Sequence, residues 1–149
     1  NAVGMPNGIA AGQAWETEKR IDVIEYHRAK TGSLFVGSVS AGAIAGGVDP
    51  SEWRPLGEKI GEAYQLADDL LDATGSSNEC GKPVDQDSIN SKPNAILEFG
   101  LEHAMKRLKQ TVQDAADAVP VCGGSDDLRE LIINQATRLV PAKYSNMAA

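Results

Sequence analysis

Hydrophobic residues recur along most of the chain at the spacing of an amphipathic helix, and no stretch of β-branched and aromatic residues alternates with polar ones. The pattern therefore predicts an all-α protein. We expect a short helix over residues 21–29 and a second over residues 31–45, which is rich in Gly, Ala and Ser. Each interior glycine costs up to about 1 kcal/mol relative to alanine, so packing against neighbouring helices must hold the second helix.

A third helix has the clearest start signal. Asp49 is a good N-cap, Pro50 suits the first helical position, and Glu52 adds favourable negative charge to the first turn. This helix should run to about Asp72. In its second half the apolar positions form one stripe along the helix: Ile60, Tyr64, Ala67 and Leu71.

The rest of the chain should hold two more helical segments. Residues 75–92 form a polar loop, longer than a simple connection requires and so more typical of a functional segment. Residues 93–118 should be helical with a break near Gly100. Ser125 should cap a last helix that ends before Pro141.

Composition narrows the class of protein. The 149 residues, 42% of them hydrophobic, suit one domain with a sizeable core. A formal net charge of -7 argues against a nucleic-acid partner, because phosphate binding needs clustered Lys and Arg. Cys80 and Cys122 have neither zinc-ligand nor disulfide spacing, so we expect a reducing, cytoplasmic setting. No apolar run is long enough for a membrane span.

Acidic residues gather near the end of the third expected helix. Asp68 and Asp72 lie one turn apart with Asp69 beside them, and Gln65 shares their stripe. Such a pair repels by about 0.2–0.5 kcal/mol on a helix surface, so something positive should compensate. The ordinary explanation is a solvated acidic face. The alternative is a Mg²⁺ site, because Mg²⁺ is usually held by one or two carboxylates, with water and phosphate oxygens in its other positions.

Five linked segments favour the metal site. They are residues 12–16 (GQAWE), 30–32 (KTG), 65–72 (QLADDLLD), 81–83 (GKP) and 92–94 (KPN). Their order and spacing resemble the second half of the trans-isoprenyl diphosphate synthases, the polyprenyl synthetase family, and the resemblance covers nearly the whole chain. The first and fourth segments are most similar to the geranylgeranyl and farnesyl diphosphate synthases of carotenoid-making bacteria.

The resemblance implies an isoprenoid-synthase helical bundle, usually a homodimer. It implies a Mg²⁺-dependent prenyltransferase that joins isopentenyl diphosphate head-to-tail to an allylic diphosphate. Metal ions and lysines would stabilise the charge that develops on the departing diphosphate. The metal would be held by Asp68, Asp69 and Asp72. The substrate-binding residues would be Gln13, Lys30, Thr31, Gln65, Lys82 and Lys92, of which Lys30, Thr31, Gln65 and Lys82 would act in catalysis.

Taken singly, these residues also have ordinary explanations. Lone lysines and glutamines are common on protein surfaces, and Thr31 would suit a helix cap. We expect His27 and His103 on the surface, because neither has a ligand partner at useful spacing. Trp15 and Phe35 are expected to pack rather than to touch substrate.

The sequence also departs from the family pattern. The earlier aspartate-rich motif and its arginine pair are absent, so we expect one helical domain over 1–149 that is the C-terminal part of a longer synthase and inactive by itself. Asp85 stands where the family usually has glycine, and Glu16 where many relatives have aspartate. A terpene cyclase shares the ionisation step, although the KTG and GKP segments favour chain elongation. The other alternative is a non-catalytic subunit or degenerate relative that binds a full-length synthase.

Overall fold

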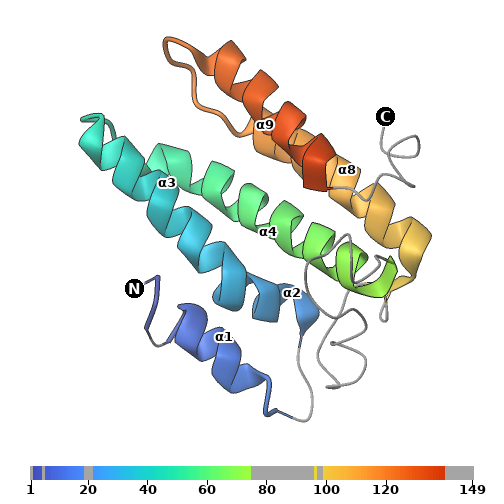
Figure 1. The fold of residues 1–149 in the computed structure, drawn as a ribbon. Coiled ribbons are helices and arrows are strands. Elements are labelled where there is room, and N and C mark those ends of the chain that lie inside the picture. Colours follow the sequence, from blue (N-terminus) through green and yellow to red (C-terminus); the bar gives the residue numbers. More distant parts are fainter. Residues whose placement is uncertain (1, 5, 19–21, 75–95, 97–98, 140–149) are drawn as a thin grey trace.

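The computed structural model describes most of the chain: residues 2–4, 6–18, 22–74, 96 and 99–139. Within these ranges every regular element is a helix, as the sequence predicted (Figure 1). The elements are α1 (Ile9–Trp15), α2 (Val23–His27), the π-helix η1 (Arg28–Gly32), α3 (Ser33–Ala45), α4 (Pro50–Thr74), α8 (Leu101–Asp117) and α9 (Ser125–Leu139). None of the helices described is long and apolar enough to cross a membrane.

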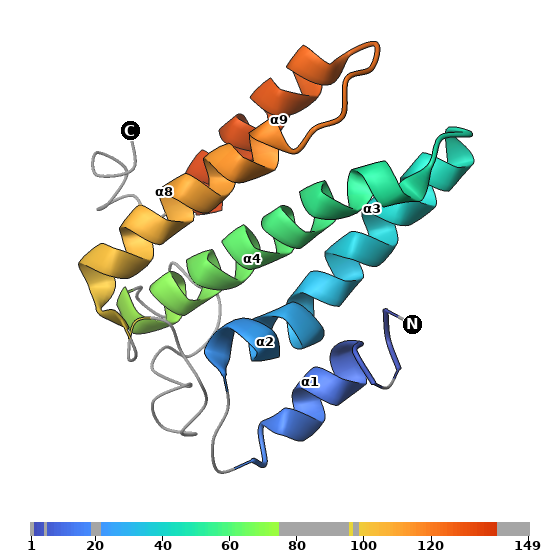
Figure 2. The ribbon, with the colours of Figure 1, turned by 180° about the vertical axis from the view of Figure 1, so that it is seen from behind.

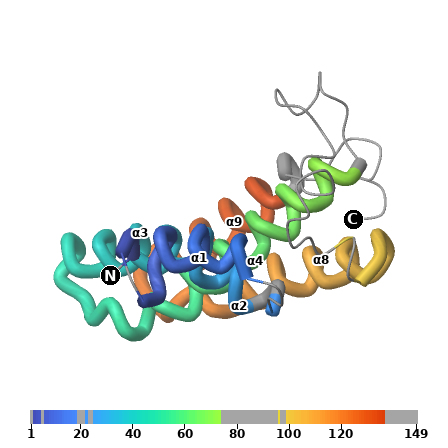
Figure 3. The backbone as a smooth tube through the Cα atoms, turned by 90° about the horizontal axis from the view of Figure 1, so that it is seen from below, coloured from blue at the N-terminus to red at the C-terminus, as the bar shows by residue number. Residues whose placement is uncertain are grey.

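Helix α4 occupies the middle of the arrangement. It lies between α3 on one side and α8 on the other, and α9 packs against α8 (Figures 1 and 2). Helices α2, η1 and α3 follow one another as a single bent rod, and α1 packs against η1. The view from below shows the helices in a shallow layer, from which the last turns of α4 rise (Figure 3). The centre of α4 therefore has helices on both sides.

The start of α4 and the break before α8 follow the local signals in the sequence. The backbone N–H of Ser51 donates to Asp49 Oδ1 at 2.8 Å, which confirms the N-cap, and this bond lowers the pKa of the Asp49 carboxyl. Gly100 has φ 83°, a conformation that favours glycine, and α8 begins at the next residue. Ser125 is the first residue of α9 rather than the residue before it, a difference typical of helix ends.

The two helices expected before residue 46 are not separate. The π-helix η1 joins them, so the rod continues without a break from Val23 to Ala45. π-Helical turns inside α-helices are rare and often occur at functional sites. The sequence contains no proline here that would have ended either helix, and the widened turn brings Gly32 against α4.

Two glycines of α4 allow the rod to approach it closely. A Cβ at Gly61 would lie 2.6 Å from Gly32 Cα, and one at Gly57 would lie 2.7 Å from Val36 Cα. Backbone would have to move to admit either methyl group. Small residues do serve close helix packing, as expected, but these glycines belong to α4. On α3, Gly42 has no heavy atom near its Cβ position and only Ala43 is buried.

The hydrophobic core lies mainly between α4 and α8. The buried residues of this cluster are Ala63, Leu66, Ala67, Leu70, Ala104, Met105 and Leu108. The apolar stripe expected on α4 is therefore only partly correct. Ala67 is buried, but Tyr64 is 45% exposed, and Ile60 and Leu71 are half-buried. The contact with α8 is made by positions next to the expected stripe. Helical periodicity alone cannot show which of two adjacent apolar stripes faces the partner helix.

Candidate functional site

Lys30 lies in a small polar cluster between η1 and α1. Its Nζ donates to the Tyr26 hydroxyl oxygen at 2.7 Å and lies 3.0 Å from Glu16 Oε1. The Tyr26 hydroxyl in turn donates to the same Glu16 oxygen at 2.7 Å. We call Glu16, Tyr26 and Lys30 the lysine cluster. It fixes the position of a cation that keeps about a quarter of its side chain exposed, at 28%.

The backbone of α1 comes close enough to form this cluster because residue 12 is glycine. A Cβ at Gly12 would lie 2.5 Å from Lys30 Cα. Since Glu16 follows Gly12 by about one helical turn, any displacement of α1 would move the carboxylate away from Lys30. The segment that resembles the family therefore has a packing role as well as the binding role expected for it.

A second set of polar side chains joins η1 to α4. Thr31 Oγ1 donates to Gln65 Oε1 at 2.7 Å, and Gln65 Nε2 donates to Asp69 Oδ1 at 2.9 Å. The other Asp69 oxygen lies 3.6 Å from His27 Nε2. We call Thr31, Gln65, Asp69 and His27 the buried relay, because Gln65, Asp69 and His27 are all buried and Asp69 is 0% exposed. It runs directly beside the lysine cluster, through Tyr26–His27 and Lys30–Thr31.

The surface position expected for His27 is wrong, because its side chain is buried, at 7% exposure. On an isolated helix this position would face solvent. Because the rod packs against α4, the position faces Asp69 instead. Burial lowers the pKa of His27 to about 4, and the Lys30 ammonium adds to this, while Asp68 and Glu62 oppose it. The imidazole is therefore neutral near pH 7.

The three aspartates expected to hold metal differ in their surroundings. Asp69 is fully buried, Asp72 is 5% exposed, and Asp68 is half-buried. Within the described ranges, no group of three or more His, Cys, Asp and Glu side chains is arranged to hold a metal ion. Mg²⁺ needs only one or two protein carboxylates when water and phosphate fill its other positions, so the donor chemistry of Asp68 and Asp72 still fits it.

The structure gives less support for the other expected site residues. Gln13 is exposed on α1. Its backbone carbonyl accepts from the Glu16 N–H at 3.2 Å, as in a helix end, but no side-chain hydrogen bond between described residues joins it to either polar cluster. Lys82 and Lys92 lie outside the described residues, and so does Asp85. The surface position of His103 is confirmed, and Phe35 packs as expected, its ring centroid 5.3 Å from that of Tyr64.

Sequence reasoning missed Tyr26 and His27, although a signal for them existed. They precede Lys30 and Thr31 by four residues, about one helical turn, so the two pairs share a face of the rod. A tyrosine and a histidine one turn before a Lys-Thr pair would have justified assigning all four to one site. The partners Glu16 and Asp69 come from other helices, and their proximity depends on tertiary packing.

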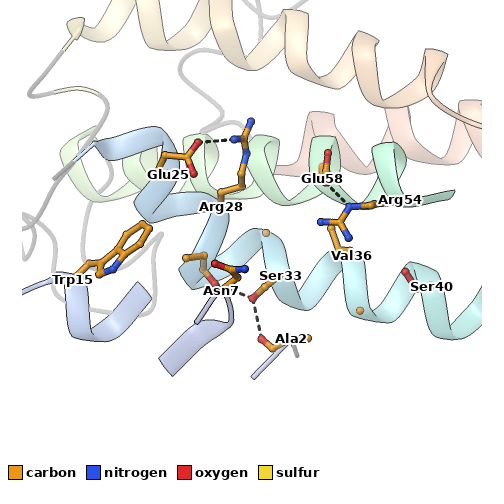
Figure 4. A pocket seen from close by; sticks show the side chains of 13 residues that line it. Ala2, Asn7, Trp15, Glu25, Arg28, Ser33, Val36, Ser40, Arg54 and Glu58 are labelled. Carbon is orange, nitrogen blue, oxygen red and sulfur yellow. Dashed lines mark hydrogen bonds and ion pairs between the residues drawn. The ribbon is translucent and has the colours of Figure 1, made fainter. Parts of the chain in front are cut away.

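A cavity of about 720 Å³ lies elsewhere, among α1, the rod and the first half of α4 (Figure 4). Its charged residues are already paired. Arg28 lies 2.6 Å from Glu25, and Arg54 lies 2.9 Å from Glu58. Both guanidinium groups of this cavity therefore already have a carboxylate partner, as Lys30 has in Glu16.

Comparison with known proteins agrees with the resemblance seen in the sequence. Residues 4–122 match the family model described as Polyprenyl synthetase. The chain is 48% identical over 142 residues to the geranylgeranyl diphosphate synthase of Cereibacter sphaeroides, covering 95% of this chain and 49% of that protein. It is 36% identical to the farnesyl diphosphate synthase of Geobacillus stearothermophilus, covering 78% of this chain and 46% of that protein.

A solved structure is also similar, the geranylgeranyl pyrophosphate synthetase from Pyrococcus horikoshii Ot3, with 26% identity and a TM-score of 0.49 over 94% of this chain and 51% of that chain. The chain thus spans about half the length of the curated relatives it matches. The match to the family model and the identity to these synthases together show that the chain belongs to the polyprenyl synthetase family.

Proposed function

We propose that this chain supplies the diphosphate-binding half of a Mg²⁺-dependent trans-prenyltransferase, which condenses isopentenyl diphosphate with an allylic diphosphate to give geranylgeranyl or farnesyl diphosphate. Family membership and the names of the relatives support the reaction class. One observation in the structure supports the site. The 2.7 Å hydrogen bond from Thr31 to Gln65 joins two of the motif segments across 34 residues of sequence.

In this proposal the allylic C–O bond breaks heterolytically, and negative charge develops on the departing diphosphate. When bound through Asp68 and Asp72, Mg²⁺ would supply Lewis-acid stabilisation of that charge. Lys30 stabilises the same charge as a positioned cation, because Tyr26 and Glu16 already hold its ammonium in place. The alkene of isopentenyl diphosphate then attacks the allylic cation, and the departed diphosphate takes up a proton from the resulting cation, which restores a double bond and completes the longer product.

Thr31 has one hydroxyl proton, which it donates to Gln65 in this structure. A diphosphate oxygen is also an acceptor, so it would compete with Gln65 for that proton. Thr31 can therefore contact the diphosphate as a donor only by turning away from Gln65, which leaves Gln65 Oε1 available to the developing cation. Some finer points stay predictions: Lys82 on the diphosphate, Lys92 at the rim of the site, Gln13 near the allylic chain, a homodimer, a cytoplasmic location and a role in carotenoid synthesis.

Binding of inorganic diphosphate tests the proposal on this chain directly. Clustered carboxylates repel an anion unless a cation bridges them, so calorimetry should detect binding only when Mg²⁺ is supplied. Equally tight binding in the presence of a chelator would remove the basis for the metal role of Asp68 and Asp72.

Asp68→Ala sharpens this test. The substitution should weaken Mg²⁺-dependent diphosphate binding at least about tenfold while leaving the melting temperature nearly unchanged, because it relieves repulsion from neighbouring carboxylates. Asp127→Ala, at an exposed position on α9, is the matched control and should leave binding unchanged. A large loss of melting temperature with normal binding would show that Asp68 is structural.

Turnover requires the part of the fold that the relatives have in addition to this chain. We would fuse the chain to the remaining half of the Cereibacter sphaeroides synthase and assay product formation from isopentenyl and allylic diphosphates. The fusion should be active, and Lys30→Ala should lower its turnover more than about a hundredfold. Unchanged turnover in the Lys30→Ala fusion would contradict the role of the lysine cluster.

A further inference from the structure

Both carboxyl oxygens of Asp69 face a polar side chain. It is 0% exposed, its Oδ1 accepts from Gln65, and its Oδ2 faces His27 at 3.6 Å. A Mg²⁺ ligand must present an oxygen to an ion that keeps several of its waters. In Asp69 one oxygen is engaged by Gln65 and the other faces His27, whereas the half-buried Asp68 retains solvent access.

The acceptor oxygen Oδ1 of Asp69 sets the orientation of the Gln65 amide. With Nε2 toward Asp69, Gln65 presents its Oε1 to the Thr31 hydroxyl. If the amide were turned over, its oxygen would face the carboxylate, and two acceptors would oppose each other in a buried place. Asp69 therefore decides which atom of Gln65 faces Thr31, and with it the direction of the Thr31 hydroxyl proton.

His27 completes the arrangement behind Asp69. Its Nε2 is buried and makes no hydrogen bond within the part of the chain that the structure describes, and the atom opposite it is an Asp69 oxygen. A neutral imidazole has one N–H. With the proton on Nε2, the ring directs a donor at the carboxylate. With the proton on Nδ1, a lone pair would face it instead.

We propose that Asp69 and His27 are positioning residues for Gln65 and Thr31, with His27 as its Nε2–H tautomer, and that Asp69 is not a metal ligand. The effect of this arrangement on diphosphate binding rests on the proposed function. The arrangement itself is a property of the metal-free chain, so it can be tested separately.

The first test uses NMR on the chain without metal or substrate. The Gln65 side-chain amide, assigned with Gln65→Glu, should exchange its protons slowly in the wild type and at least about tenfold faster in Asp69→Ala. The matched control is Gln113, which donates to Asp117 at 3.0 Å with the same spacing but on an exposed surface. Its amide should exchange quickly with or without Asp117→Ala. An unchanged Gln65 amide in Asp69→Ala would overturn the proposal.

The same samples report the tautomer of His27. Long-range ¹H–¹⁵N spectra at neutral pH should show the proton on Nε2, and His27→Gln should shift the Gln65 amide signals because the support of Asp69 is altered. A proton on Nδ1, or Gln65 signals that do not move in a folded His27→Gln variant, would refute the role of His27.

The second test separates positioning from metal binding. Asp69→Asn keeps the volume of the side chain and an acceptor for Gln65, so it should weaken Mg²⁺-dependent diphosphate binding at least about fivefold less than Asp68→Asn does. An equal loss in the two variants would identify Asp69 as a metal ligand and overturn the proposal. If the wild type itself does not bind diphosphate, the proposed function fails, and the NMR results still decide the positioning role.

Discussion

Helix α4 buries two sides of its surface by different means. The side toward α8 is apolar, and Leu66 and Leu70 pack there against Met105 and its neighbours. The side toward η1 is polar, and Gln65 and Asp69 are buried there through hydrogen bonds and the nearby His27. Apolar packing is non-directional and mainly supplies stability. The polar side contributes orientation, because each of these hydrogen bonds needs a donor and an acceptor in a fixed direction.

The largest effect should come from the apolar side. Leu70 is 0% exposed, and Leu70→Ala should lower the free energy of unfolding by about 2–5 kcal/mol, measured by urea denaturation. Leu131→Ala on α9 is the control, since Leu131 is 52% exposed and its truncation should cost less than about 1 kcal/mol. Equal losses would mean that the contact between α4 and α8 does not form the core.

The contribution of the polar side to the free energy of unfolding should depend on pH. His27 has a pKa of about 4 in the folded chain against 6.5 in the unfolded chain, so the unfolded state takes up the proton first as the pH falls. The neutral ring's contribution is complete above pH 6.5 and is lost between there and about 4. At pH 5 the loss of this contribution should lower the free energy of unfolding by about 2 kcal/mol relative to neutral pH.

His27→Gln provides the comparison for this prediction. Other groups titrate in the same window, and the charged side chains near His27 are Lys30, Asp68, Glu62 and Arg107, together with Asp69. Subtracting the urea denaturation data of the variant from those of the wild type isolates the histidine. A difference that does not change between pH 7 and pH 5 would contradict a buried, neutral His27.

The smallest effect should come from the ion pair at the rim of the contact between α4 and α8. Arg107 Nη2 lies 2.7 Å from Glu62 Oε1, but the two side chains are 34% and 28% exposed. Arg107→Met keeps most of the stem and should lower the free energy of unfolding by about 0.2–1 kcal/mol at low salt. High salt should reduce the loss further, and a salt-independent loss of several kcal/mol would show that the stem matters more than the charge.

The sequence predicted the features that depend on neighbouring residues. The cap at Asp49, the break at Gly100 and the all-α class were all read from signals that act within about one helical turn. Burial along α4 was predicted less well. Tyr64 lies on the expected apolar stripe and is 45% exposed, because the position of α8 around α4 is a property of the whole fold.

The candidate site was also predicted only in part from the sequence. Resemblance brought Lys30, Thr31 and Gln65 together, and the structure places Thr31 and Gln65 in direct contact, while their catalytic roles stay predictions. Tyr26 was not found, although it lies one helical turn before Lys30, and its contact with Glu16 depends on the close packing of α1 on η1. Nothing in the spacing of Glu16 within its own segment indicates that contact.

The π-helix has a consequence for register. An α-helix advances about 100° per residue, so the additional residue in a π-turn sets the rotational phase between the parts of the rod before and after it. Deleting one residue between Arg28 and Gly32 would turn Tyr26 and His27 by roughly that angle relative to the face that meets α4. The number of residues in the π-helix, rather than their identity, therefore aligns His27 with Asp69, and the deletion of one residue would be enough to lose this alignment.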